Sequence, residues 1–338
     1  MDSDFSRQLV CRSIVANPKH PKHKRYCDFF RLLSVCHAVN ISEIEDEEDG
    51  EKDDADEDHT EIDTSPMANA GASASLVVND GNPSTPGDVS SSLVVNDGNP
   101  STPGAQTQVQ YAGMSPDEVA LVQASSENGF TMTKREMVDG IDTIFVKQDG
   151  FEEEHQYQIE YEFEFDSDRK RQSVVAWCLE PNSKNKRRVL FTKGADNIME
   201  ELLNKTSPVD RMPDECHRQI TRFSSQGLRC LILAQRELPD KIFKPWEKKM
   251  KVAEQALEGR KQGIRECWAE LEVDLSFVGV SAVEDRLQDG VPSTIQLLRR
   301  AGIRVWMLTG DKVETGSRKA KPKYNLDFET VFGNSPRI

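Results

Sequence analysis

The chain has 338 residues, a hydrophobic content of 36% and a formal net charge of −15. Fourteen acidic residues and one lysine lie between positions 43 and 63, so one tract carries nearly all of the net charge. The remainder has no extended basic face for nucleic acid and no apolar run of the about eighteen residues that a membrane helix needs. The acidic start, MDSDFSRQL, lacks the apolar centre of a signal peptide.

Two segments precede the first long ordered region. Residues 1–41 contain apolar side chains at helical spacing, which predicts a helix over 27–40. Residues 42–108 contain the acidic tract and a repeated unit, SLVVNDGNPSTPG, at Ser75–Gly87 and at Ser92–Gly104. Asn-Asp-Gly and proline favour turns over a packed core. We therefore expect a long disordered insertion at 42–108.

The next region, 109–274, alternates helix and strand signals. Ser115, Pro116 and Glu118 form the start signature of a helix, and Gly129 marks its end. Apolar and polar residues then alternate up to Phe165, which predicts a strand with one dry face. Strands at 173–179 and 188–193 would complete an antiparallel meander. We expect the intervening DRKR, residues 168–171, to be a solvated turn.

The last ordered region is predicted to have a different architecture. An apolar strand at 275–284, a helix that ends near Gly302 and an apolar strand from Ile303 follow one another. The order strand, helix, strand, in which both strands are continuously apolar, predicts a parallel βαβ unit. The fold class is therefore an antiparallel α+β lobe followed by the start of a parallel α/β lobe.

Thr309, Gly310 and Asp311 follow the last of these strands. Ligands in open α/β sheets bind at the carboxyl ends of strands, so this cluster suits phosphate. Because Gly-Asp is also common in ordinary turns, the residues alone leave both interpretations open. No histidine spacing predicts zinc. We interpret Cys36-His37 as structural, because sequence neighbours rarely form a nucleophile–base pair.

Four further residues have both a functional and a structural interpretation. Lys193 stands at a strand end beside a glycine and suits an anion, but without further context a surface lysine is the favoured interpretation. Arg229 could bind phosphate as a fork. Phe165 could stack on a base or pack in the core. Glu118 is explained by helix capping alone, so its role as a ligand residue is weak without further context.

Taken together, the motifs resemble a known family. SPDE at 115–118, FDSDRKRQSVV from Phe165, KGAD at 193–196, GLR at 227–229 and the run VEDRLQDGVPSTIQLLRRAGIRVWMLTGDKVET from Val283 occur in this order. This order resembles the phospholipid-translocating P-type ATPases, or lipid flippases, over roughly two-thirds of the chain. Gln172 and Cys230 depart mildly from the family pattern, which usually has Met and Thr there.

The resemblance implies roles for these residues. Glu118, Phe165, Lys193 and Arg229 match the positions that hold ATP, with Phe165 on the adenine and Arg229 toward phosphate. Residues 309–311 match the phosphate-handling loop of a haloacid-dehalogenase-like phosphorylation domain. In the family, ATP phosphorylates an aspartate in a DKTGT motif with Mg²⁺, and the cycle moves phospholipid at a membrane whose cytoplasmic side carries these domains. An accessory subunit is a further partner of the full-length family.

Several family features are absent from this sequence. It contains neither DKTGT nor GDGxND, which would supply the phosphorylated aspartate and the Mg²⁺ ligands, and it has no membrane helices. We therefore expect no catalytic or metal-ligating residue here. We expect a soluble, cytoplasmic fragment with an ATP-binding domain at 109–274, a poorly packed partial phosphorylation domain at 275–316 and an unstructured tail at 317–338. A stand-alone nucleotide-binding module that does not hydrolyse ATP, or an inert truncated remnant, is the alternative.

Overall fold

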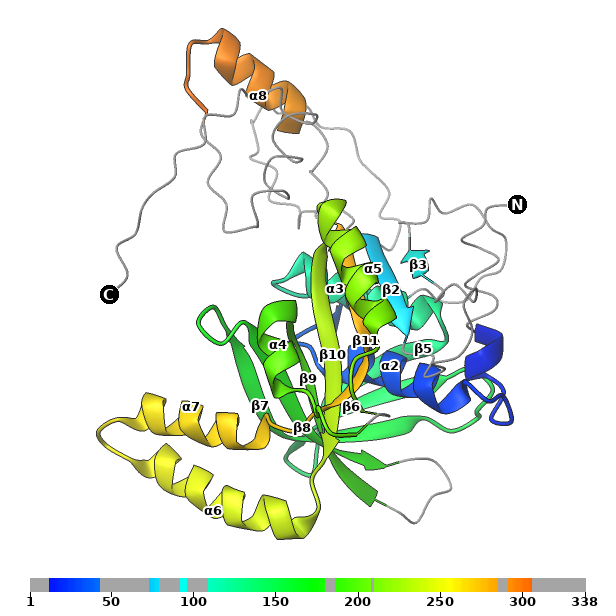
Figure 1. Cartoon of the computed structure of the whole chain (residues 1–338), viewed down its shortest axis with the longest axis vertical. Coiled ribbons are helices and arrows are strands. Elements are labelled where there is room, and N and C mark those ends of the chain that lie inside the picture. The colour runs from blue at the N-terminus through cyan, green and yellow to red at the C-terminus, as the bar shows by residue number, and fades with distance from the viewer. Residues whose placement is uncertain are drawn as a thin grey trace, which may run out of the picture.

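A nine-stranded antiparallel sheet forms the centre of the molecule (Figure 1). The computed structural model describes residues 12–42, 73–78, 92–95, 109–179, 186–207, 210–284 and 291–305. The order of the strands is β3-β2-β11-β10-β9-β8-β7-β6-β5. Their bounds are β2 (Ser73–Val78), β3 (Ser92–Val95), β5 (Phe130–Val138), β6 (Ile141–Gln148), β7 (His155–Asp166), β8 (Arg171–Leu179), β9 (Lys186–Ala195), β10 (Arg229–Glu237) and β11 (Ser276–Glu284). The predicted antiparallel α+β lobe is confirmed.

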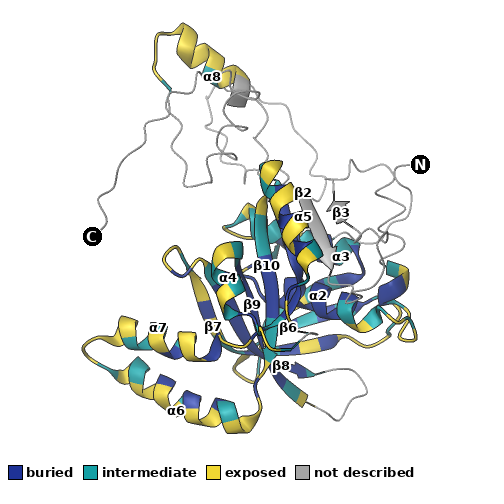
Figure 2. Cartoon of the chain, viewed as in Figure 1, coloured by how far each residue is buried: buried dark blue, intermediate teal, exposed yellow. Residues whose placement is uncertain are grey.

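Helices cover both faces of this sheet and bury an apolar core on each side. One core contains side chains of α2 (His23–Val35) and α3 (Pro116–Glu127). The other core contains side chains of α4 (Asp196–Leu202), α5 (Asp214–Ser225), α6 (Asp240–Gln255) and α7 (Arg260–Leu271). Figure 2 shows buried residues between the layers and exposed ones along the outer sides of α6 and α7. A short sheet of β1 (Asn40–Ser42) and β4 (Gln110–Ala112) lies apart from the large one.

The helix signals predicted α3 well and α2 less well. Ser115 caps α3, because its hydroxyl accepts the backbone N–H of Glu118 at 3.4 Å. Gly129 follows the helix with a φ of +92°, a conformation that glycine adopts without strain. The helix expected at 27–40 instead spans His23–Val35. Beyond it the ring of His37 bonds to backbone groups on both sides, which favours a turn over another helical residue.

The hairpin of β5 and β6 was missed by the sequence analysis, although a signal for it was present. Asp139 and Gly140 join the two strands, and both have positive φ, at 52° and 79°. An Asp-Gly pair between β strands is typical of a tight hairpin turn, because these residues tolerate the left-handed region. The hairpin supplies the outer strands at one edge of the sheet.

Strand β7 does not keep one dry face along its whole length, as the alternating pattern had predicted. Its pairing with β8 shifts register twice, between Ile159 and Tyr161 and between Phe163 and Asp166. The residues before the first shift belong to the core beneath α2, whereas Phe163 belongs to the core beneath α6 and α7. Each bulge adds a residue on one strand, so the side chains that follow it change face.

The expectation for the last lobe is wrong in one respect. Strand β11 pairs antiparallel with β10 and with β2, so the parallel strand predicted at 275–284 is a member of the large sheet. The antiparallel lobe therefore extends to Glu284, ten residues past the predicted boundary at 274. Helix α8 (Val291–Arg300) follows, with its described side chains mostly exposed. Residues 306–338, which include Thr309, Gly310 and Asp311, lie outside the described residues.

Part of the insertion predicted to be disordered forms strands. Each copy of the repeat supplies one: β2 contains Ser75–Val78 of the first copy, and β3 is the Ser-Leu-Val-Val of the second. The two copies pair antiparallel with Leu76 opposite Leu93. Disorder throughout 42–108 is therefore not confirmed. The acidic tract at 43–63 lies outside the described residues.

We expect hydrogen exchange to separate β11 from α8. Amides of β11 are bonded to strands on both sides, so they should exchange at least about a hundredfold more slowly than those of α8, whose Leu297 is 63% exposed. Mass spectrometry of peptides from 276–284 and 291–300 in one sample makes this comparison, with α8 as the internal control. Equally fast exchange in both peptides would contradict the placement of β11 in the sheet.

Candidate functional site

Three of the predicted site residues lie at one end of the sheet. Strands β7 and β9 end where β8 and β10 begin, because neighbouring antiparallel strands run in opposite directions. Phe165 is near the end of β7, Lys193 is near the end of β9, and Arg229 begins β10. The first turn of α3 carries the fourth residue, Glu118, to the same place, where its carboxylate meets Lys193.

A buried ion pair joins Lys193 to Glu118. The Lys193 Nζ lies 2.7 Å from Glu118 Oε1, and the two side chains are 6% and 17% exposed. In the sheet Lys193 lies opposite Leu233, which belongs to the core beneath α2 and α3, so Lys193 faces that layer. A buried ammonium requires a partner of opposite charge. The interpretation of Lys193 as a surface lysine is therefore wrong.

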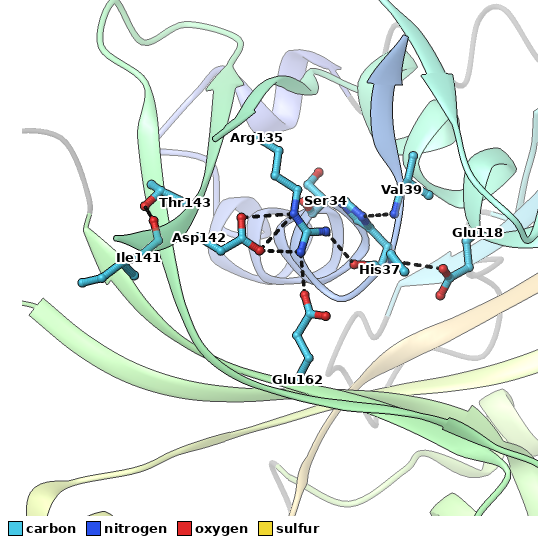
Figure 3. A network of polar contacts seen from close by, with 10 residues as sticks. Ser34, His37, Val39, Glu118, Arg135, Ile141, Asp142, Thr143 and Glu162 are labelled. Carbon is cyan, nitrogen blue, oxygen red and sulfur yellow. Dashed lines mark hydrogen bonds and ion pairs between the residues drawn. The ribbon is translucent and has the colours of Figure 1, made fainter. Parts of the chain in front are cut away.

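Glu118 does more than help to begin α3. Its second oxygen, Oε2, accepts the backbone N–H of Ala38 at 3.0 Å (Figure 3). Burial alone would raise the pKa of Glu118, but Lys193 and the Ala38 N–H outweigh burial, and the pKa is lowered. The carboxylate is therefore ionised at neutral pH and ties α3 to both β9 and the segment after α2.

A second ion pair lies beside the first and is more open to solvent. Arg229 Nη1 is 3.1 Å from Asp117 Oδ2, and the Arg229 side chain is 42% exposed. Arg229 precedes Leu233 by four residues in β10, so strand alternation puts it on the same face as Lys193. Consecutive carboxylates in the first turn of α3 thus contact two cations of the sheet. Asp117 was missed by the sequence analysis.

Phe165 has an unusual position for an apolar residue in a strand. Its side chain is 64% exposed, whereas Phe163 two residues earlier is fully buried. It lies in the second bulge of β7, and the next residue, Asp166, contacts Arg265 of α7. Because Asp166 faces α7, alternation turns Phe165 to the opposite face, which carries Lys193. Only β8 separates β7 from β9, so their backbones are about 10 Å apart.

A polar network supports the segment that holds Glu118 (Figure 3). Arg135 of β5 donates to the carbonyl of His37 at 3.3 Å, to Asp142 at 2.5 Å and to Glu162 of β7 at 2.6 Å. The contacts join residues up to 98 positions apart, which is why local sequence patterns did not predict them. They fix the turn after α2, from which Ala38 offers its N–H to Glu118.

Cys36 and His37 are buried within this turn, in line with a structural role. Burial raises the pKa of Cys36 to about 12, so the thiol stays protonated. Burial, and next to it the charge of Lys193, lowers the pKa of His37 to about 3. Its Nδ1 accepts the N–H of Val39 at 3.1 Å and its Nε2 donates to the carbonyl of Ser34 at 2.9 Å, a tautomer assigned from these partners.

The DRKR turn is anchored and not merely solvated, contrary to expectation. Arg169 and Arg171 both bind Glu272, whose side chain is 0% exposed. Arg171 also lies against Gly194: a Cβ added there would be 2.6 Å from the Arg171 Cβ. Glycine beside Lys193 therefore allows the turn and β9 to approach each other closely.

This arrangement suits the binding of an anion that carries an aromatic ring. An exposed phenyl ring, a buried ammonium and a partly exposed guanidinium share one face of the sheet. Among the described residues, no group of three or more His, Cys, Asp or Glu side chains could hold a metal ion. None of the helices in the described ranges has both the length and the apolarity needed to cross a membrane.

Comparison with known proteins agrees with the fold and the motifs. Residues 89–290 match the family described as P-type ATPase, cytoplasmic domain N. The chain is 40% identical to Phospholipid-transporting ATPase 1 of Arabidopsis thaliana, over 61% of this chain and 17% of that protein. It is 38% identical to Phospholipid-transporting ATPase IC of Homo sapiens, over 62% of this chain and 16% of that protein.

A third relative, Phospholipid-transporting ATPase DNF1 of Chaetomium thermophilum, is 38% identical over 61% of this chain and 12% of its own length. The chain therefore spans less than a fifth of the length of these curated relatives. The large antiparallel sheet with helices on both faces is consistent with the α+β nucleotide-binding domain of this family. The chain belongs to the P-type ATPase cytoplasmic domain N family, and the resemblance to phospholipid-transporting ATPases is confirmed.

We expect Gly194→Ala to destabilise the fold by about 1–3 kcal/mol, because the added methyl would overlap Arg171 and the Lys170 carbonyl. Gly263→Ala in α7 is the matched control. Its Cβ would meet only Ala253 at 3.5 Å, so the change should be neutral or stabilise by up to about 1 kcal/mol. Urea unfolding of both variants measures the difference. Equal stability of the two variants would contradict the close approach at Gly194.

We expect His37 to make stability depend on pH. Its pKa is about 3 when folded and about 6.5 when unfolded, so between these values the unfolded chain binds the extra proton. The contribution of His37 to the free energy of unfolding is therefore complete above pH 6.5. It falls as the pH drops toward 3, by up to about 1.4 kcal/mol per pH unit. Urea midpoints from pH 7 to pH 5 for wild type and His37→Gln measure this. An unchanged slope in His37→Gln would contradict the assignment.

Proposed function

We propose that this chain binds ATP through the face that carries Phe165, Lys193 and Arg229. The observation that carries the proposal is the combination of a buried ion pair, Lys193 with Glu118, and an exposed phenyl ring in the adjacent bulge. The match to domain N of the P-type ATPases supports the same ligand. The ion pair fixes the Lys193 ammonium in place, and the Phe165 ring leaves an aromatic face open to solvent on the same side of the sheet.

In the proposed complex each group has a separate task. The adenine ring stacks on Phe165, which gains contact area that the free protein leaves in water. Lys193 lines the pocket, with its position fixed by Glu118. Arg229 exchanges Asp117 for a phosphate oxygen, since its side chain is 42% exposed and can turn toward the ligand. The site so described binds and orients ATP.

The reaction itself belongs to a larger assembly in this proposal. We infer that the chain is the ATP-binding part of a phospholipid-transporting P-type ATPase, like the relatives whose names state that activity. There, the γ-phosphate is transferred to an aspartate outside this sequence, with residues 309–311 as the phosphate-handling loop. Phospholipid, an accessory subunit and the cytoplasmic face of a membrane are the proposed partners and location of that complete translocase.

Magnesium enters this proposal through the family resemblance, as the ion that accompanies ATP. Among the described residues there is no group of three or more His, Cys, Asp or Glu side chains that could hold a metal ion, and no residue is assigned to it. No step at the present site is therefore assigned to the metal. The chain's own residues have two tasks in this proposal. Phe165 stacks on the base, and the side chains of Lys193 and Arg229 place the phosphates.

We expect isothermal titration calorimetry to show ATP binding in the micromolar to millimolar range. Phe165→Ala should weaken it by about 5- to 150-fold, since stacking on one base is worth about 1–3 kcal/mol. Combining Phe165→Ala with Lys193→Ala should abolish detectable binding. Met137→Ala is the matched control, because that side chain is equally exposed, at 66%, but lies on β5.

Two outcomes would overturn this function. One is a wild-type protein that is folded by circular dichroism and binds no ATP. The other is a Phe165→Ala protein that binds ATP as well as Met137→Ala does. Circular dichroism of the double variant separates lost binding from lost folding, because Lys193→Ala leaves Glu118 without its cation.

A further inference from the structure

A second buried carboxylate lies on the face of the sheet opposite the proposed ATP site. Glu272 follows α7 directly, and its side chain is 0% exposed. Its Oε1 accepts from Arg169 Nη2 at 2.5 Å and from the Ser173 hydroxyl at 2.6 Å, and its Oε2 accepts from Arg171 Nε at 2.7 Å. One carboxylate thus holds both arginines of the turn between β7 and β8.

This cluster reaches the backbone next to Phe165. The other terminal nitrogen of Arg169, Nη1, donates to the carbonyl of Glu164 at 2.9 Å. The guanidinium therefore links Glu272 to the residue that precedes Phe165, and it stacks on Trp268 of α7 with 4.7 Å from Cζ to the ring centre. The Phe165 ring is 64% exposed, so its direction depends on how the backbone of the bulge is held.

We propose that Glu272 is a positioning residue for the nucleotide: through Arg169 it sets the bulge that aims the Phe165 ring at the adenine. This inference rests on the proposed ATP binding. A carboxylate is required because both of its oxygens face guanidinium or hydroxyl donors. A glutamine there would turn its own N–H groups toward one arginine and lose that bond.

The arrangement also requires an arginine at position 169. Its planar fork donates to Glu272 and to the Glu164 carbonyl at once. A lysine at position 169 would keep the charge beside Glu272 but could not hold both partners in that geometry. Arg169→Lys therefore loosens the bulge while keeping the buried charges balanced, which makes it the milder variant.

The test is a binding study of the full chain with ATP, adenosine and tripolyphosphate. Glu272→Gln and Arg169→Lys should each weaken ATP and adenosine by roughly tenfold, the range of one stacked base, and leave tripolyphosphate unchanged. In a Phe165→Ala background, the same changes should alter ATP affinity by less than about twofold, because the ring they position is gone. Glu270→Gln, an exposed carboxylate on the same helix that pairs with Lys249, is the matched control.

The other possible results of this binding study distinguish failure of the positioning role from failure of the proposed function. Unchanged ATP affinity in Glu272→Gln, an equal loss of ATP and tripolyphosphate, or a loss that persists without Phe165 overturns the positioning role. If Glu272→Gln does not fold, Arg169→Lys decides by the same criteria. A folded wild-type protein that binds no ATP overturns the proposed function, and this inference with it. Wild-type binding that depends on Phe165 but not on Glu272 or Arg169 overturns this inference alone.

Discussion

The buried pair of Lys193 and Glu118 is the contact on which the proposed site depends. A lysine that is 6% exposed in the middle of a sheet is strongly unfavourable without a carboxylate in contact with it. The carboxylate reaches Lys193 from the first turn of α3, which Ser115 caps, and Ala38 supplies a second bond to it. The pair therefore sets the position of α3, of the turn after α2 and of the neighbouring pair between Asp117 and Arg229.

The sheet has charged clusters on both faces at this end. Glu118 and Lys193 lie on the face beneath α2 and α3, whereas Glu272 with Arg169 and Arg171 lies on the face beneath α7. Strands β8 and β9 connect the two: Arg171 is paired with Gly194, the residue after Lys193. The two charged clusters therefore come closest at Gly194, where the Cβ of any other residue would clash with Arg171. The DRKR turn and β9 are therefore in close backbone contact at this point.

The bulges of β7 explain how a single strand contributes side chains to both cores and to the solvent-exposed surface. An unbroken strand would put Tyr157 and Phe163 on the same face, since both are odd positions. The two register shifts instead give Tyr157 to the core beneath α2, Phe163 to the core beneath α7 and leave Phe165 open to solvent. Local alternation cannot reveal a bulge, because a bulge is a property of the pairing between β7 and β8 and not of the sequence of β7 alone.

What the sequence by itself determined was the class of the fold and the candidate residues for the site. Local signals such as the cap at Ser115 act over a few residues, and motif order identified Glu118, Phe165, Lys193 and Arg229. Only the tertiary structure decided that Lys193 is buried and that β11 joins the antiparallel sheet. The same holds for the ion pairs of Asp117 with Arg229 and of Glu272 with Arg169. The physical reason is distance along the chain: Arg169 and Glu272 are 103 residues apart, and only packing makes them neighbours.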